Sequence, residues 1–213
     1  MIIDLHAHTY PLSDDSDLSP DELIDKAKRS GLDGICLTEH DWHWKEADIA
    51  DLSHKHDFPV FHGMEVSSEE GHLLVFGLDG YTFGLHHARF VRKLVDEAGG
   101  FIILAHPYRR RVRYNPDPLK LMDTVCKDRL LGLVDAIEVL NGRSRDAEND
   151  FARELSRRLH LKGIGGSDAH SLLDIPSYAT EFERSIRTTS ELIAELREGR
   201  YRPVNLRSST TVE

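Results

Sequence analysis

The chain opens with MIIDLHAHTY, residues 1–10, and this stretch decides how the rest of the sequence is interpreted. Its apolar start predicts a β-strand, in which side chains two residues apart point to the same face. His6 and His8 therefore project together, while Ala7 points away. Two neutral imidazoles side by side can bind a transition metal, although a His-x-His pair also occurs at strand ends without a metal.

Later parts of the sequence repeat this arrangement, because segments predicted as strands also end on His, Asp or Glu. Predicted strands cover residues 34–38, 59–64, 72–77, 101–105, 134–140 and 178–182, and a glycine-rich segment at 163–167 leads to Asp168. Predicted helices cover residues 20–30, 47–56, 90–98, 119–125, 147–159 and 190–197. The first helix begins with a capping box, Ser19 with Glu22, and has Pro20 at its first position. The segment at 72–77 follows Glu65 too closely for a helix between them, so a hairpin is expected there.

Strands that alternate with helices predict a parallel sheet, and about seven such units predict closure into a barrel. The expected fold is an α/β, TIM-like barrel formed by a single domain over residues 1–213. In such a barrel the catalytic groups sit at the C-terminal ends of the strands. These ends are occupied by His6, His8, His40, Glu65, His106, Asp168 and His170.

Composition disfavours several classes of protein. With 39% hydrophobic and 30% charged residues, the 213-residue chain resembles ordinary soluble globular proteins. A formal net charge of −10 disfavours non-specific binding to nucleic acid. The sequence has no apolar run of membrane-spanning length and no recognisable signal peptide, so a cytoplasmic location is expected. The two cysteines, Cys36 and Cys126, are expected to be reduced.

Several blocks of the sequence, taken in order, resemble the polymerase and histidinol phosphatase (PHP) superfamily of metal-dependent phosphoesterases. They are DLHAHT at 4–9, Ser13-Asp14, TEHD at 38–41, Gly63-Met64-Glu65, Ala105-His106-Pro107 and GSDAH at 166–170. The resemblance covers nearly the whole chain. It implies a distorted (β/α)7 barrel that binds two or three Mn, Fe or Zn ions.

The resemblance also implies which residues hold the metal ions. The first ion would be bound by the residues that also form the catalytic set, namely His6, His8, Glu65 and Asp168. Glu65 would bridge to a second ion held by His106 and His72. A third ion would be bound by Asp14, His40 and His170. Alternatives stay open at two positions, because Asp15 and Asp17 share a loop with Asp14, and His62 competes with His72.

This ligand set suits the hydrolysis of phosphate esters. A bridging carboxylate lets two divalent cations lie ~3.5–4 Å apart without prohibitive repulsion. Such a pair lowers the pKa of bound water and generates hydroxide near neutral pH for attack on phosphorus. Asp4 and Glu39 precede ligands in the chain and are expected to orient imidazoles as hydrogen-bond acceptors. The remaining histidines are expected at the surface, namely His43, His54, His56, His86, His87 and His160.

A phosphate ester also needs cationic side chains, and the predicted loop after His106-Pro107 carries four arginines, at 109, 110, 111 and 113. Arg109 in this loop and Arg143, which follows Asn141-Gly142, are the candidate substrate-binding residues. Only residues 66–83 and 108–119 are available to cover the site. An open site with modest selectivity is therefore expected.

The sequence thus predicts a hydrolase, a metal-dependent phosphoesterase or phosphatase whose partner is a small phosphate ester, either a phosphorylated metabolite or a nucleotide. A 3′–5′ exonuclease acting on short oligonucleotides and a non-catalytic metal-binding regulatory domain are the alternatives. No membrane and no longer nucleic acid is expected as a partner. An amidohydrolase is disfavoured, since that family typically uses a carboxylated lysine at a central strand end, and this chain has Glu65 at the bridging position.

Overall fold

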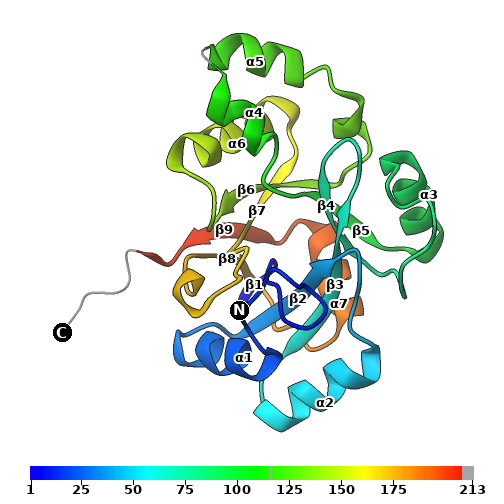
Figure 1. Ribbon diagram of the computed structural model, residues 1–213, viewed down its shortest axis with the longest axis vertical. Coiled ribbons are helices and arrows are strands. Elements are labelled where there is room, and N and C mark those ends of the chain that lie inside the picture. Colours follow the sequence, from blue (N-terminus) through cyan, green and yellow to red (C-terminus); the bar gives the residue numbers. More distant parts are fainter. Residues whose placement is uncertain (116, 208–213) are drawn as a thin grey trace.

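A nine-stranded sheet, curled into a nearly closed barrel, organises the computed structural model, which describes residues 1–115 and 117–207. The strands are β1 (Ile2–Asp4), β2 (Gly34–His40), β3 (Val60–Ser67), β4 (His72–Phe76), β5 (Phe101–Leu104), β6 (Ala136–Asn141), β7 (Lys162–Gly166), β8 (Tyr178–Phe182) and β9 (Tyr201–Asn205). Their order in the sheet is β7-β6-β5-β4-β3-β2-β1-β8-β9. The predicted α/β, TIM-like barrel fold is therefore confirmed (Figure 1).

The strand directions explain why the barrel is distorted. β1, β2 and β3 pair in parallel, and so do β5, β6 and β7. Between these two groups β4 runs antiparallel to both β3 and β5, which confirms the hairpin predicted from the short connection after Glu65. The edges of the sheet are β7 and β9, and the segment after β7 joins the segment after β1, where Ala7 pairs in parallel with Ala169. The chain segment that carries His6 and His8 therefore takes part in closing the barrel.

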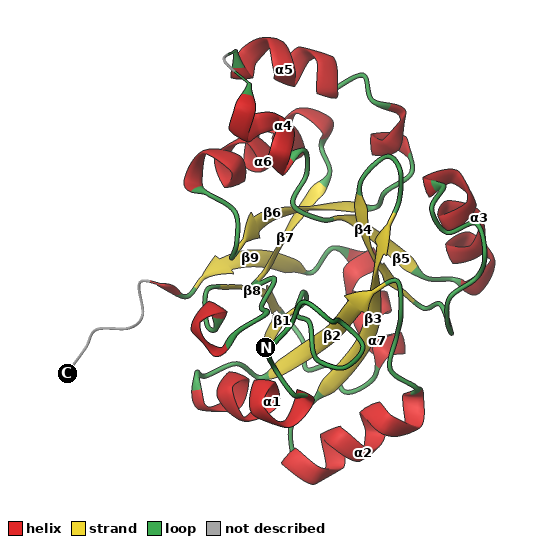
Figure 2. Cartoon of the chain, in the orientation of Figure 1, coloured by secondary structure: helices red, strands yellow, loops and turns green. Residues whose placement is uncertain are grey.

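Helices surround the sheet and cover it with apolar side chains (Figure 2). They are α1 (Pro20–Arg29), α2 (Glu46–His56), α3 (Ala88–Ala98), α4 (Arg109–Tyr114), α5 (Pro118–Val125), α6 (Asp146–Leu159) and α7 (Thr189–Glu198), with 3-10 turns η1 (Arg129–Gly132) and η2 (Leu172–Asp174). Figure 2 shows α1 and α2 at one end of the view and α4, α5 and α6 at the opposite end. In the described part of the chain, no helix combines the length and the apolar character that crossing a membrane requires.

Local sequence explains how the first helix is fixed. The Ser19 side chain accepts a hydrogen bond from the Glu22 backbone N–H, and the Glu22 carboxylate accepts one from the Ser19 backbone N–H, which is the predicted capping box. Leu23, Ile24 and Ala27 are fully buried against the sheet. Burying Leu23 and Ile24 stabilises this contact by roughly 1.5–3 kcal/mol per side chain.

The structure differs from the sequence-based prediction at two elements. Residues 109–113 were expected to form a loop, but they belong to helix α4, because arginine is a good helix former and no glycine or proline interrupts the run. Strand β9 was not predicted, since its Pro203 interrupts the β-pattern. β9 is an edge strand beside β8, a place where a proline is tolerated. The predicted single domain also includes residues 208–213, which lie outside the described residues.

Candidate metal centre

One end of the barrel collects nearly all the predicted ligands. His6 and His8 follow β1, His40 ends β2, and Glu65 lies near the end of β3. His106 follows β5, and Asp168 and His170 follow β7. His72 joins them from the start of β4, because β4 is antiparallel and its first residue pairs with Ser67 at the end of β3. The topology, including the reversed strand, therefore brings these side chains to a common edge.

The Glu65 carboxylate lies at the centre of this group. It is fully buried, and its Oε1 lies 2.9 Å from His72 Nδ1 and 2.9 Å from His106 Nε2. Its Oε2 lies 3.1 Å from His40 Nδ1 and 3.2 Å from His8 Nε2. None of the described residues gives Oε2 a well-formed hydrogen bond. A buried carboxylate oxygen that faces several imidazole nitrogens without a hydrogen bond suits a metal-bridging role.

The arrangement of His6 and His8 also favours a bound cation. Their Nε2 atoms lie 3.0 Å apart in a fully buried position. Each ring uses its other nitrogen elsewhere, since His6 Nδ1 lies 3.0 Å from Glu138 Oε1 and His8 Nδ1 lies 3.2 Å from Ser13 Oγ. With both Nδ1 atoms donating, the two Nε2 lone pairs face each other, which is unfavourable unless a proton or a metal ion lies between them.

The pKa shifts indicate that the site attracts positive charge. Burial lowers the pKa of His8 to about 4, so this imidazole is neutral at pH 7. Burial acts in the same direction on His6, but the carboxylates of Glu138, Asp168 and Glu65 outweigh it and raise the pKa of His6 well above its ordinary value. Burial would also raise the pKa of Glu65, yet the imidazoles around it hold that pKa well below the usual range. A divalent cation can replace the proton on His6, so the donor set fits a metal.

Asp168 completes the group around His6 and His8. Its Oδ1 lies 3.5 Å from His6 Nε2 and 3.6 Å from His8 Nε2. The Arg109 guanidinium donates to Asp168 Oδ2 over 3.0 Å. The backbone of Asp168 has φ +55°, and that of His106 has φ +25°, in the left-handed region that non-glycine residues seldom occupy. Such strained residues concentrate at functional sites, where the surrounding structure holds them in place.

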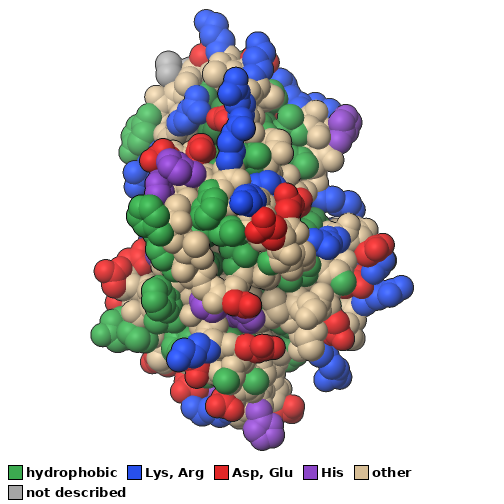
Figure 3. All heavy atoms as spheres, turned by 90° about the vertical axis from the view of Figure 1, so that its right-hand side faces the viewer, with side chains coloured by type: hydrophobic (Ala, Val, Ile, Leu, Met, Phe, Trp, Pro, Cys, Tyr) green, Lys and Arg blue, Asp and Glu red, His purple; other side chains and the backbone are tan. Residues whose placement is uncertain are grey.

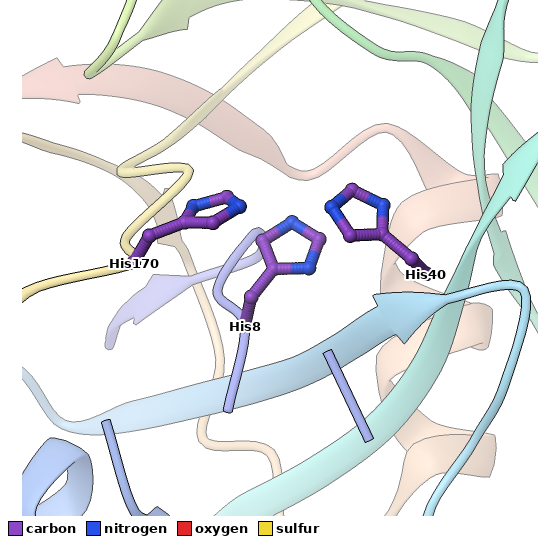
Figure 4. Close-up of side chains that lie close together, drawn as sticks. All are labelled: His8, His40 and His170. Carbon is purple, nitrogen blue, oxygen red and sulfur yellow. The ribbon is translucent and has the colours of Figure 1, made fainter. Parts of the chain in front are cut away.

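Two of the imidazoles beside Glu65, those of His8 and His40, also lie next to His170 (Figure 4). The rings of His8, His40 and His170 lie side by side although they come from three different segments, with ring centroids 4.2 Å apart for His8 and His40 and 4.4 Å apart for His8 and His170. Their nitrogens lie close enough together to bind one ion. The carboxylate beside them belongs to Asp15, whose Oδ2 lies 3.2 Å from His170 Nε2 and 3.4 Å from His40 Nε2.

This position favours Asp15 among the three aspartates, Asp14, Asp15 and Asp17, that the sequence left open. The Ser16 N–H donates to the Ser13 carbonyl, which forms a turn over residues 13–16. Ser13 and Ser16 are buried, while Asp14 and Asp15 are both exposed, and it is the Asp15 carboxylate that contacts His40 and His170. Asp15 therefore replaces Asp14 as the candidate ligand. Sequence alone left this open because the direction of each carboxylate depends on the turn.

A match to a family model supports the resemblance seen in the sequence. The model described as the PHP domain matches residues 4–164. This chain belongs to the PHP family. A second model, described as PHP-associated, matches residues 146–201, so the two matches together extend from β1 to β9.

Known proteins similar to this PHP chain include an uncharacterised protein of Methanocaldococcus jannaschii, which is 26% identical over 181 residues, covering 74% of this chain and 95% of the relative. Among solved structures, a two-domain protein of Bacteroides vulgatus, described as containing a predicted PHP-like metal-dependent phosphoesterase, has a TM-score of 0.69 and 18% identity. The match covers 96% of this chain but only 64% of that protein. A candidate metal-dependent phosphoesterase of Bifidobacterium adolescentis has a TM-score of 0.59 and 15% identity, with coverage of 90% and 94%. At these identities the structural matches support the fold.

The structure distinguishes His72 from His62, which were the alternative ligands for the second ion. His72 lies in the group around Glu65, as described above. His62 points elsewhere, toward His43, with the two ring centroids 6.1 Å apart, and borders a different pocket with Glu46 and Asp79. The structure thus brings His72 to the candidate centre and leaves His62 outside it.

The residues that hold the imidazoles in place differ from those expected. Asp4 was expected to orient an imidazole, but its Oδ1 accepts hydrogen bonds from the backbone N–H groups of His6 and Ser167. Its burial raises its pKa to about 6. Glu39 acts indirectly, since it accepts a hydrogen bond from the Ser13 hydroxyl (2.6 Å) that lies beside His8.

Glu138 on β6 is the carboxylate that contacts an imidazole directly, and the sequence analysis missed it. It is fully buried, lies next to His6 Nδ1 through Oε1, and accepts the His106 backbone N–H through Oε2 (2.8 Å). Gly166 on β7 makes this approach possible, because a Cβ there would lie 2.6 Å from the His6 Cβ and 2.9 Å from Glu138 Oε1. A charged residue in the middle of the apolar strand Ala136-Ile137-Glu138-Val139-Leu140 was the available signal.

A pocket of about 400 Å³ opens beside the centre. His72 and His106 form part of its wall, and Arg109, Arg110 and Arg111 from α4 form another part. Arg109 is thus placed between the pocket and Asp168. The other predicted substrate-binding residue, Arg143, is exposed, and its backbone N–H donates to Asn141 Oδ1.

Proposed function

We propose that this PHP chain is a hydrolase that cleaves a phosphate ester of a small metabolite or nucleotide with the help of two or three Mn²⁺, Fe²⁺ or Zn²⁺ ions. The main support is the Glu65 carboxylate, which is buried and has imidazole nitrogens within 2.9–3.2 Å of both its oxygens. Mixed imidazole and carboxylate ligands suit these metals. A carboxylate shared in this way is the feature expected of a centre with more than one ion.

The residues of this chain have distinct tasks in the proposed reaction. His6, His8, Glu65 and Asp168 would hold the first ion, Glu65 would share the second with His72 and His106, and Asp15, His40 and His170 would hold a third. When bound, such ions supply Lewis acidity and a hydroxide near neutral pH. Glu138 keeps the His6 ring in place and favours the tautomer whose Nε2 lone pair faces the centre.

The arginines of α4 supply the charge that recruits the substrate. The chain carries a net charge of −10, which repels anions at long range. Arg109, Arg110 and Arg111 counter this charge locally at the pocket wall. A planar guanidinium can donate two parallel hydrogen bonds to a phosphate. A pocket of about 400 Å³ has the size that a small phosphate ester needs, and it is open to solvent on the arginine side, where Arg110 and Arg111 are exposed.

The test is phosphate release by Mn²⁺-loaded protein across nucleoside monophosphates, sugar phosphates and short oligonucleotides. Asp168→Asn serves as the inactive variant, and Asp48→Asn, at an exposed position on α2, serves as the matched control. We expect turnover of at least one monomeric ester that falls by more than about 100-fold in Asp168→Asn and stays unchanged in Asp48→Asn. Cleavage of oligonucleotides alone would point to the exonuclease. The absence of turnover above that of Asp168→Asn would refute the proposal.

A further inference from the structure

Three side chains outside the candidate metal centre, one carboxylate and two imidazoles, are of the types that bind metal ions, and they form a separate group. Glu69 lies in the turn between β3 and β4, and His86 and His87 directly precede helix α3. A nitrogen of each imidazole and an oxygen of the carboxylate all lie within 4.8 Å of one another. Figure 3 shows the face of the molecule that carries α3, where histidine side chains lie beside acidic ones at the surface.

We propose that Glu69, His86 and His87 form a separate binding site for a borderline divalent ion such as Zn²⁺. Two imidazoles and one carboxylate are a ligand set that Zn²⁺ uses in proteins with a fourth position left for water. This set favours Zn²⁺ over Mg²⁺ or Ca²⁺, which prefer oxygen ligands alone. This proposal does not depend on the reaction proposed for the central cluster.

The distances suit an ion better than direct contacts between the side chains. His87 Nδ1 lies 3.6 Å from Glu69 Oε2, which is too long for a hydrogen bond. It is close to the spacing of roughly 3.3–3.5 Å expected between two ligands at about 2.0–2.1 Å from a tetrahedral zinc ion. The rings of His86 and His87 lie 4.0 Å apart, centroid to centroid, so rotation of the side chains is enough to direct one nitrogen of each at a common point.

The backbone already holds the two segments together. The Glu69 N–H donates to the His86 carbonyl over 2.9 Å, and the Ala88 N–H donates to Glu70 Oε2 over 3.2 Å. Leu85 and Ala88, on either side of the histidine pair, are fully buried. The metal would therefore bind to a framework that is fixed in advance, which lowers the entropic cost of assembling its ligands.

The position of this site gives it a defined effect on the pocket. Residues 68–71 form a tight turn, in which the Ser68 and Gly71 backbones donate to each other, and this turn is one wall of the pocket beside the central cluster. Glu69 and His87 are exposed, at 68% and 55% of their side-chain surface, so ions in solution can reach them. An ion bound here would tie the pocket wall to the start of α3 and make the turn more rigid.

The experiment counts Zn²⁺ bound at saturation by equilibrium dialysis, and compares wild-type protein with Glu69→Gln, His87→Ala and His54→Ala. His54 is exposed on α2 and belongs to neither group, so His54→Ala is the matched control. We expect the first two variants to bind one Zn²⁺ fewer than wild type and the control to bind the same number. Equal stoichiometry in all four proteins would overturn the proposal.

A second measurement follows the turn itself. Hydrogen exchange of the amides at residues 68–71 is followed during a Zn²⁺ titration of wild-type protein and of His87→Ala, because Zn²⁺ also enters the central sites and the variant isolates that contribution. We expect exchange there to slow by several-fold in wild type and to stay constant in His87→Ala, because the ion bound at the proposed site restrains the turn. Exchange that stays constant in wild type up to saturating Zn²⁺ would contradict the site.

Discussion

Glu65 and Glu138 are both fully buried carboxylates at the same end of the barrel, yet their surroundings give them different roles. Glu65 faces nitrogens with both its oxygens and has one oxygen without a well-formed hydrogen bond among the described residues. Glu138 is occupied by His6 Nδ1, the His106 backbone and the Asn141 amide. Glu65 is therefore the candidate for direct contact with an ion, while Glu138 positions His6, another candidate ligand.

Replacing Glu138 by Gln tests this division of roles. The variant keeps the shape of the side chain but removes the negative charge beside His6 Nδ1. We expect the affinity for Mn²⁺ to fall by roughly 10–100-fold, as is typical when a carboxylate behind a metal-bound imidazole is lost. Competition with a chelating dye measures this affinity. Glu97→Gln, on the exposed face of α3, is the control, and an unchanged affinity in Glu138→Gln would mean that Glu138 does not support the centre.

Asp14 and Asp15 form a natural pair for a second test, because they are exposed neighbours in one loop and the Asp15 carboxylate is the one that contacts His40 and His170. Asp15→Asn should lower the number of Mn²⁺ ions bound at moderate concentration by one, since its carboxylate lies 3.2 Å from His170 and 3.4 Å from His40. Asp14→Asn should bind as wild type does. Metal analysis after gel filtration distinguishes the two, and the reverse result would restore Asp14 as the ligand.

For single residues, the sequence predicted the placements that follow from strand periodicity. His6 and His8 were placed together because residues two apart share a face, and their Nε2 atoms do meet. Asp15 and Glu138 could not be found in that way. The direction of Asp15 depends on a turn in a loop. The role of Glu138 depends on how β6 lies beside β7 and the segment after β1 that carries His6, which the sequence pattern does not contain.

Among the elements, α4 has the most direct effect on the site, because its first residue, Arg109, reaches Asp168. The helix is short and has no buried residue of its own. It is held to α6 by Arg113, which donates through Nε (2.7 Å) and Nη2 (3.1 Å) to the buried Glu148 carboxylate. The position of the arginines that line the pocket therefore depends on this ion pair.

The pH dependence of stability tests the contact between α4 and α6. Burial would raise the pKa of Glu148, but its hydrogen bonds with Arg113 and the Arg145 backbone lower it below the ordinary 4.5. Because the folded-state pKa is depressed, the stabilisation is fully present above pH 4.5 and is lost as the pH falls through the lower folded value.

We therefore expect Glu148→Gln to lower the Tm by roughly 2–4 °C at pH 7, the change that about 1 kcal/mol produces in a chain of this size. The difference from wild type should shrink as the pH falls below 4.5. Calorimetry at several pH values measures it. A difference that stays constant with pH would show that packing, rather than the ion pair, holds α4.

Helices and strands were predictable where the sequence has a clear apolar periodicity or capping residues. They were not predictable where neighbouring elements determine the local structure. The helix that begins at Pro20 was found because its capping box and apolar stripe agree. The short helix α4 lacks an apolar stripe, so the arginine run resembled a loop. The edge strand β9 contains Pro203, which argues against a strand unless its place at the edge of the sheet is known.

At the scale of the molecule, the segments that close the barrel also carry four of the candidate ligands. Ala7, which follows β1, pairs with Ala169, which follows the edge strand β7, and the residues on either side of them are His6, His8, Asp168 and His170. Metal ions bound there would link the first and the last parallel strand of the barrel. Binding should therefore stabilise the whole fold and not only the local segments.

Removal of the ions tests this coupling. We expect the Tm of protein treated with a chelator to lie below that of protein with Mn²⁺ at about 100 times its dissociation constant by roughly 5–10 °C for each bound ion, because each site contributes about 2.7 kcal/mol. Differential scanning calorimetry gives both values. The shift should be smaller in Asp168→Asn. An equal Tm with and without Mn²⁺ would mean that no ion binds preferentially to the folded chain.

The most direct test of the account is an anomalous difference map from crystals grown with saturating Mn²⁺. The account predicts at least two peaks within ligand distance of Glu65, one beside His6, His8 and Asp168 and another beside His72 and His106. A map with no peak within ligand distance of Glu65 would contradict it, because the convergence of these side chains would then have to be explained without a metal.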